Sequence, residues 1–364
     1  MGIKNLPVID LTGSPRERGR AHGEALRQPI AEVRGRWRAS LAARFGVHPD
    51  VFIATLLAEN HFVDATRRST PELLEEIEGI AEGSGRPDAE TLAFQFMDEE
   101  WWFGTKRFGP AAQPLNRCSL IASRAAQGQS PILAQNMDLR AYHDGGQAVL
   151  RIIDDRAGDR APSATILTIC GMVALCGAND LGLGVAVNTL WQLPSSSEGL
   201  PVACVVRGLL TQRNLTEAAR WIAKTAHASG QHYMLGDADG FASFEASGKA
   251  VRRVSWDAAA PNFIHTNHPI SSEGSARHLP AEENSRGRYQ MLCELAGAKT
   301  LEVAQVQSAL ADRSGPHPIS VRPADGDDAG MMTFASIIME LKRPPAIMIA
   351  AGPPCSNPYR KIAG

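Results

Sequence analysis

The chain has 364 residues, with 37 Lys and Arg against 39 Asp and Glu, and a formal net charge of -2. Hydrophobic residues make up 44% and charged residues 21%, which is ordinary globular usage and excludes a disordered, collagen-like or coiled-coil chain. The near-neutral balance argues against a nucleic-acid-binding protein, which usually carries a basic excess. Six cysteines in a chain of this length do not form a disulfide scaffold.

The N-terminal sequence MGIKNLPVIDL has no basic segment followed by an apolar stretch of about 7 to 15 residues, so we expect no signal peptide. No run approaches the roughly 18 apolar residues that a membrane span requires. We therefore expect a cytoplasmic protein without a membrane partner.

The first 110 residues are predicted to be helical. The segment SPRE at 14–17 combines an N-cap, a proline at the first helical position and a glutamate at the capping-box position. A helix is therefore predicted from there to Phe45, where Gly46 ends it. The segment TPE at 70–72 predicts the start of a second helix, and Asp88 predicts the cap of a third.

Near residue 118 the pattern changes to short apolar runs separated by Gly, Pro, Asp and Asn, which is typical of strands and turns. Later segments predict two helices, a run of strands with hairpin turns at DADG and ASGK, another helix and a terminal hairpin. These are predicted over about 200–212 and 215–226, 232–254, 282–297, and 331–341 with 346–352. The succession predicts an α+β fold of antiparallel sheets covered by helices.

Cys118 begins a predicted strand after a loop rich in Pro and Gly, a position that would leave its thiol accessible. Asp138 follows twenty residues later at the end of the next predicted strand, so a hairpin would bring its carboxylate back beside Cys118. A thiol and a carboxylate at one edge of a sheet make a workable nucleophile site. On the residues alone, the commoner alternative is a buried packing cysteine and a turn aspartate.

Six segments follow one another in an order that is shared with a known family. They are GSPRERG at 13–19 with His22 and Gly23, Cys118 and Ser119 with QNMD at 135–138, GANDLGL at 177–183 with Asn188, HTNHP at 265–269, SRGRY at 285–289, and TFAS at 333–336 through GPPC at 352–355. Together they resemble the acyl-coenzyme A:6-aminopenicillanate acyltransferase family, the C45 autoproteolytic peptidases among the N-terminal-nucleophile hydrolases. Six matches in the right order make the resemblance specific.

The resemblance implies a four-layer αββα sandwich of antiparallel sheets, made as an inactive precursor that cuts itself between Arg117 and Cys118. It implies one integrated fold in two parts, a helical N-terminal fragment, 1–117, and a catalytic core, 118–364, which stay associated. Cleavage frees an α-amine on Cys118, and a pKa of about 7.7–8.0 suits that amine to act as a general base. Fungal members have glycine before the nucleophile, so Arg117 predicts slower cleavage or a different source of strain.

The resemblance also implies roles for other residues. Asp138 is expected to orient the new α-amine, and Asn267 to donate its side-chain amide to the oxyanion of the tetrahedral intermediate. Asn188 is expected as a second polar group lining the site. Three more residues are expected near the pocket in substrate-binding or structural roles: Arg288, Gln135 and His268. For Arg288 an exposed helix arginine is the alternative.

Two other motifs carry weaker signals. His265 and His268 suggest zinc, but zinc enzymes commonly place two histidines at i and i+4 on a helix with a glutamate between them. Here the spacing is i, i+3 in a predicted strand, with Asn267 between the histidines. Gly182 and Gly184 lack the third glycine and the following helix of a dinucleotide site. We expect no metal and no cofactor.

The predicted function is that of a self-activating N-terminal cysteine amidohydrolase or acyltransferase. It would transfer an acyl group from a small amide or acyl thioester, through a thioester on Cys118, to water or an amine. Hydrolysis of a small amide is preferred, because no segment marks a coenzyme A site. The alternative is an unprocessed, non-catalytic relative that acts as a small-molecule binding protein. Helices in the first hundred residues would suit a homodimer.

Overall fold

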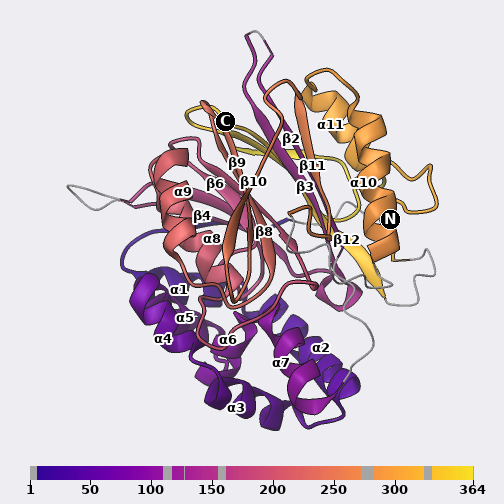
Figure 1. Cartoon of the computed structure of the whole chain (residues 1–364). Helices are drawn as coiled ribbons and strands as arrows, with labels where there is room; N and C mark the ends of the chain where they lie inside the picture. Colours follow the sequence, from indigo (N-terminus) through magenta and orange to yellow (C-terminus); the bar gives the residue numbers. More distant parts are fainter. Residues whose placement is uncertain are drawn as a thin grey trace.

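The computed structural model describes residues 6–109, 117–126, 128–154, 161–271, 282–323 and 330–363. Two β-sheets lie against each other, helices cover their outer faces, and a group of helices lies at one end of the sandwich (Figure 1). Among the described residues no single helix is long and apolar enough to cross a membrane, and the one helix pair that would pass together is bent by 82°.

The first sheet has the strand order β1-β4-β5-β6-β7-β8-β9-β10. Its neighbouring strands are antiparallel except for β1 and β4, which are parallel. The bounds are Val8–Leu11 (β1), Gln147–Ile152 (β4), Ala164–Ile169 (β5), Cys176–Asn179 (β6), Gly184–Thr189 (β7), Gln231–Asp237 (β8), Gly240–Ala246 (β9) and Val251–Val254 (β10). Strand β1 falls in a region that was predicted to be helical, and it joins the sheet edge through its pairing with β4.

The second sheet has the order β11-β2-β3-β12-β13-β14, and its neighbouring strands are antiparallel. The bounds are Asn262–His265 (β11), Arg117–Ser123 (β2), Ile132–Arg140 (β3), Met331–Glu340 (β12), Ala346–Ala350 (β13) and Arg360–Ala363 (β14). Strands β12 and β13 form the predicted terminal hairpin.

Helices α8 (Val202–Leu210) and α9 (Leu215–Lys224) cover one outer face, and α10 (Glu282–Ala296) and α11 (Val303–Leu310) cover the other (Figure 1). Leu209 of α8 packs in one cluster with Ile166 of the first sheet, and Leu292 of α10 packs in another with Ile121 of the second. A third cluster fills the space between the sheets. The predicted αββα sandwich is confirmed. Because both faces of each sheet are covered, strands such as β7 are buried along their whole length.

Helices that precede β2 lie at one end of the sandwich (Figure 1). They are α1 (Pro15–Ala25), α2 (Arg27–Phe45), α3 (Pro49–Glu59), α4 (Phe62–Ser69), α5 (Glu72–Ser84), α6 (Asp88–Phe94) and α7 (Glu99–Phe108). Trp37 and Phe94 from these helices belong to the same hydrophobic cluster as Leu133 and Met234 of the two sheets. The N-terminal segment therefore shares the central core with the strands.

The predicted helix from residue 15 to Phe45 is divided at Leu26, whose backbone angles (φ -117°, ψ 23°) end α1 and begin α2. The break lets α1 lie along α5 while α2 takes another direction. The C-terminal end at Phe45 is as predicted, because Gly46 adopts the left-handed conformation with φ 64°. The helix predicted from Asp88 is likewise divided, into α6 and α7.

Glycines set the contact between α1 and α5. Gly19 and Gly23 on α1 face Gly79 and Gly83 on α5, at a spacing of four residues on each helix. A Cβ atom added at Gly19 would lie 1.9 Å from the backbone oxygen of Glu76. The two helix backbones therefore approach so closely that side chains cannot fit between them.

Gly19→Ala is expected to destabilise the fold by about 3 kcal/mol, at the upper end of overpacking effects, because the new methyl group collides with backbone. The matched control is Gly35→Ala in α2, where an added Cβ has no atom within 4 Å. That control should stabilise the protein by about 0.5–1 kcal/mol through helix propensity. Urea unfolding of both variants measures the difference, and equal effects would contradict the close approach of the helices.

Candidate active site

Strands β2 and β3 form the predicted hairpin. Cys118 lies opposite Met137, and Arg117 lies opposite Asp138. The loop that was predicted to leave Cys118 accessible is largely 110–116, which lies outside the described residues. Cys118 itself is only 5% exposed, so the expectation of an accessible thiol is wrong. Residues from the α6–α7 junction and from α8 cover it and enclose a small cavity at its side.

The backbone of Cys118 is held on both sides by side chains from other elements. Its N–H donates to Oδ1 of Asn267 at 2.6 Å, and its carbonyl oxygen accepts from Nη1 of Arg288 at 2.7 Å. Nη2 of Arg288 also donates to Oδ1 of Asn267 at 3.0 Å. The two groups that face Oδ1 of Asn267, the Cys118 N–H and the Arg288 guanidinium, can only donate hydrogen bonds. This fixes which end of the Asn267 amide is the oxygen. Asn267 therefore contacts Cys118 as an acceptor, while its Nδ2 donates to the carbonyl oxygen of Thr189 at 3.1 Å.

Arg288 is buried, with 1% of its surface exposed, so the alternative of an exposed helix arginine is wrong. Besides its contacts to Cys118 and Asn267, it donates to Oγ of Ser119 at 3.0 Å and to Oδ1 of Asn284 at 2.9 Å. Burial lowers the pKa of Arg288 to about 10, although the charge of Asp138 opposes the shift. The guanidinium is therefore still charged at neutral pH and clamps the strand that carries Cys118.

Asp138 is fully buried and accepts a hydrogen bond from Oγ1 of Thr333 at 2.6 Å. Burial and the negative charge of Asp138 together raise the pKa of the Cys118 thiol to about 12, and a backbone hydrogen bond from Asp138 opposes the shift. In the uncut chain the thiol is therefore protonated at neutral pH, so attack by sulfur requires a base.

Two predicted site residues serve other contacts. Oδ1 of Asn188 bonds Nδ1 of His232 at 2.9 Å. Gln135 reaches across the gap between the sheets, where its Nε2 donates to the carbonyl oxygen of Val187 and its Oε1 accepts from the Val187 N–H. Gln135 thus ties β3 to β7.

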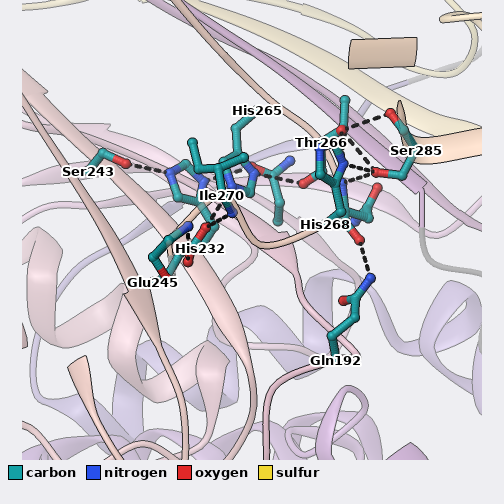
Figure 2. Close-up of polar contacts among 12 residues, drawn as sticks. Gln192, His232, Ser243, Glu245, His265, Thr266, His268, Ile270 and Ser285 are labelled. Carbon is teal, nitrogen blue, oxygen red and sulfur yellow. Dashed lines mark hydrogen bonds and ion pairs between the residues drawn. The ribbon is translucent and has the colours of Figure 1, made fainter. Parts of the chain in front are cut away.

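His268 lies within a polar network with Thr266 and Ser285 (Figure 2). Its Nδ1 bonds Oγ of Ser285 at 2.8 Å, and the same oxygen accepts from the backbone N–H of Asn267 at 2.8 Å. On the other side, Nε2 of Gln192 donates to the carbonyl oxygen of Asn267 at 3.2 Å. Burial lowers the pKa of His268 to about 4, so the ring is neutral at pH 7. The peptide that carries Asn267 is thus held from both sides.

The network continues through His265, which stacks on His232 with ring centroids 3.6 Å apart (Figure 2). Nδ1 of His265 faces the carbonyl oxygen of Thr266 at 2.8 Å, and Nε2 faces Glu245 at 3.5 Å. Both partners are hydrogen-bond acceptors. Burial acts to raise the pKa of the Glu245 carboxyl, but the hydrogen bonds from His265 and Ser271 outweigh it and lower that pKa. These histidines serve the network, and no group of three metal-ligating side chains occurs in the described ranges.

Asp98 is the residue that sequence reasoning missed. It lies between α6 and α7 and lines the same cavity as Cys118. Its Oδ2 accepts from Oγ1 of Thr189 at 3.0 Å and from Nε2 of Gln231 at 2.9 Å. Nothing in the local pattern distinguishes it from the two glutamates that follow, because its position depends on how the N-terminal helices pack against the sheets.

Glu99, the next residue, is buried and binds the start of α8. Its Oε1 accepts from the Val202 N–H at 3.0 Å and from Oγ of Ser229 at 2.6 Å. Burial raises the pKa of Glu99 to about 7, and the charge of Asp98 adds to the shift. Because the folded state binds this proton more tightly than the unfolded state, the contribution of Glu99 to stability falls as pH rises from about 4.5 to 7.

Glu99→Gln is therefore expected to stabilise the protein at pH 8 relative to wild type, by up to about 3 kcal/mol. Near pH 4.5 the wild-type carboxyl is protonated in the fold, so the difference should largely vanish. Urea unfolding at both pH values measures it. A stability difference that does not change with pH would contradict a raised pKa.

Comparisons with known proteins place the site in context. A family model described as acyl-coenzyme A:6-aminopenicillanic acid acyl-transferase matches residues 125–353, more than half of the chain. Penicillin V acylase from Agrobacterium tumefaciens has a similar structure, with a TM-score of 0.44 and 19% identity over 65% of this chain and 82% of that chain. A mutant of conjugated bile acid hydrolase from Clostridium perfringens gives a TM-score of 0.44 and 12% identity over 68% and 97%. At these scores the structural similarities carry no argument about activity. No curated protein matches the sequence.

Proposed function

Because the chain belongs to the acyl-coenzyme A:6-aminopenicillanic acid acyl-transferase family, an enzyme family of acyl transfer and amide cleavage, we propose that it is a self-activating amidohydrolase with Cys118 as its N-terminal nucleophile. The observation that carries the proposal is the clamp on Cys118. Its nitrogen lies 2.6 Å from Oδ1 of Asn267, its carbonyl oxygen is bound by Arg288, and its side chain lines a cavity. The matched range begins at residue 125, so the assignment of the nucleophile rests on this geometry.

The proposed activation cuts the bond between Arg117 and Cys118. The thiol sulfur attacks the Arg117 carbonyl carbon, the C–N bond breaks, and the thiol proton passes to the departing Cys118 nitrogen. Water then hydrolyses the thioester, which restores the thiol and leaves a carboxylate on Arg117. The products are fragments of 117 and 247 residues that remain packed around the shared core.

In the cut enzyme the α-amine of Cys118 acts as the base. In the uncut chain the Cys118 thiol, with a pKa of about 12, is ionised to only about one part in 10⁴ at pH 8, whereas a free α-amine titrates at about 7.7–8.0. The amine takes the thiol proton, sulfur attacks the substrate carbonyl, and the proton passes on to the departing amine. Water then releases the acyl group from Cys118. Oδ1 of Asn267 accepts a hydrogen bond from the amine throughout, so the lone pair of the amine nitrogen points away from Asn267.

Asn188 is proposed as a second oxyanion donor beside Asn267. One of the two N–H groups of the Asn267 amide donates to the carbonyl oxygen of Thr189, so only the other is available to an oxyanion. Asn188 is fully buried, and its Nδ2 has no hydrogen-bond partner among the described residues. An unused buried donor of this kind has the chemistry that an oxyanion needs.

Denaturing electrophoresis tests the proposal. By residue number, the 39.1 kDa chain should give bands near ~12.6 and ~26.5 kDa, and Cys118→Ala should remain at full length. The control is Cys293→Ala, which removes the exposed cysteine of α10 and should be cut like wild type. If wild type and Cys118→Ala both stay at full length and neither cleaves an amide, the protein is a binding protein and the proposal fails.

The pH dependence of the cut enzyme follows from the same chemistry. We expect kcat/KM to rise with pH as the α-amine loses its proton, with an apparent pKa near 8 or below. The rise should be complete well before the pKa of about 12 that burial gives the Cys118 thiol in the uncut chain. Steady-state rates between pH 5 and 10 measure this, and a rate that still climbs tenfold per unit at pH 10 would contradict the role of the amine.

A further inference from the structure

The cavity beside Cys118 has a volume of about 30 Å³, room for about one water molecule. Its walls are mostly apolar, and three of them are methionines, Met97, Met137 and Met172. Methionine side chains are unbranched and flexible, so such walls can move apart around a small guest. The thiol of Cys118 faces this space, so an acyl group bound to the sulfur would occupy it.

One carboxylate interrupts these apolar walls. Asp98 uses Oδ2 to accept both of its hydrogen bonds, from Thr189 and Gln231, and Oδ1 has no such partner within the described part of the chain. Among the described residues, no lysine, arginine or histidine lines the cavity. Burial raises the pKa of Asp98, while the bonds from Thr189 and Gln231 oppose the rise. Oδ2 is satisfied by these two donors, but Asp98 is only partly exposed, and its Oδ1 lies beside apolar walls without a partner of opposite charge.

On the basis of the proposed function, we propose that the substrate supplies that partner, and that the acyl group transferred to Cys118 is a short aminoacyl group whose ammonium binds Asp98. The size of the cavity limits the group to a few carbon atoms, and its walls suit the apolar part of the chain. Asp98 comes from the N-terminal segment and Cys118 from the core, so the two proposed fragments build the acyl pocket together.

Matched pairs of 4-nitroanilides test the proposal, because they differ only in a methyl group replacing the amine. The pairs are alanyl against isobutyryl and β-alanyl against butyryl, and kcat/KM is measured for each with the wild type and with Asp98→Asn. Asparagine keeps an oxygen that can accept from Thr189 and Gln231 but removes the charge. Glu99→Gln is the matched control, because Glu99 is an adjacent buried carboxyl that lines a different pocket.

Wild type and Glu99→Gln should prefer one aminoacyl compound over its isostere by about tenfold to hundredfold, as expected for a hydrogen bond to a charged group. Asp98→Asn should lose this preference, so that kcat/KM becomes similar for the two members of each pair. A wild type without the preference, or an Asp98→Asn variant that keeps it, overturns the inference while the proposed function stands. Turnover of none of the four compounds, with an uncut chain, contradicts the proposed function itself.

Discussion

Asn267→Leu is expected to lower amide turnover by about 10³-fold, whereas Asn267→Asp should retain most of the self-cleavage. Leucine removes the oxygen that accepts from the Cys118 nitrogen and from Arg288, and one pre-organised polar contact in an active site is worth about 10²–10³ in rate. Aspartate keeps an acceptor at that position and loses only the donor to Thr189.

The pair of variants separates two roles for Asn267. If the side chain holds the Cys118 amine as an acceptor, aspartate replaces it in part and leucine does not. If the side chain donates to the oxyanion, as the family resemblance implies, aspartate and leucine fail equally. Rates of self-cleavage and of 4-nitroanilide hydrolysis for both variants decide between these roles.

Arg288→Met is expected to destabilise the fold by about 3–5 kcal/mol and to abolish self-cleavage. The buried guanidinium donates to four acceptors, on Cys118, Ser119, Asn267 and Asn284. Methionine fills the space but removes one donor from each of these oxygens, although Oδ1 of Asn267 keeps the Cys118 N–H. Each buried group left unsatisfied costs about 1–3 kcal/mol. Some of this cost is relieved when the structure relaxes, which sets the expected range.

The control for this variant is Arg286→Met on the same helix. Arg286 is about half exposed, and its ion pair with Glu282 joins neighbouring turns of α10. Glu282 is buried but the Arg286 guanidinium stays in water, so the loss of this one pair should cost about 1 kcal/mol, less than the loss of the four contacts of Arg288. Urea unfolding should therefore separate the two methionine variants clearly, and equal losses would contradict the clamp on Cys118.

Much of the fold was predictable because it depends on local signals. The capping box at Ser14 and Glu17 begins α1, Gly46 ends α2, and the turn between Asp237 and Gly240 forms the predicted hairpin. The break at Leu26 and the strand β1 were not predictable in this way. Both depend on packing between distant segments, α1 on α5 and β1 on β4.

The candidate site also divides into features that local sequence predicts and features that depend on packing between distant segments. The spacing of Cys118 and Asp138 predicts their hairpin, because register between adjacent strands is a local property. The acceptor role of Asn267 depends on what lies opposite each atom of its amide, which spacing cannot reveal. Arg288 sits on a mixed helix whose pattern fits burial or exposure equally. Asp98 reaches the cavity only because the N-terminal helices pack against the end of the sheets.

Mass spectrometry of the purified protein, before and after reaction with a short aminoacyl thioester, tests the central claim most directly. We expect two fragments of 117 and 247 residues, with Cys118 at the N-terminus of the larger. The acyl mass should be added to that fragment alone and should be removed by neutral hydroxylamine, as a thioester requires. An intact chain of 39.1 kDa, a cut at another bond, or acylation away from Cys118 would contradict it.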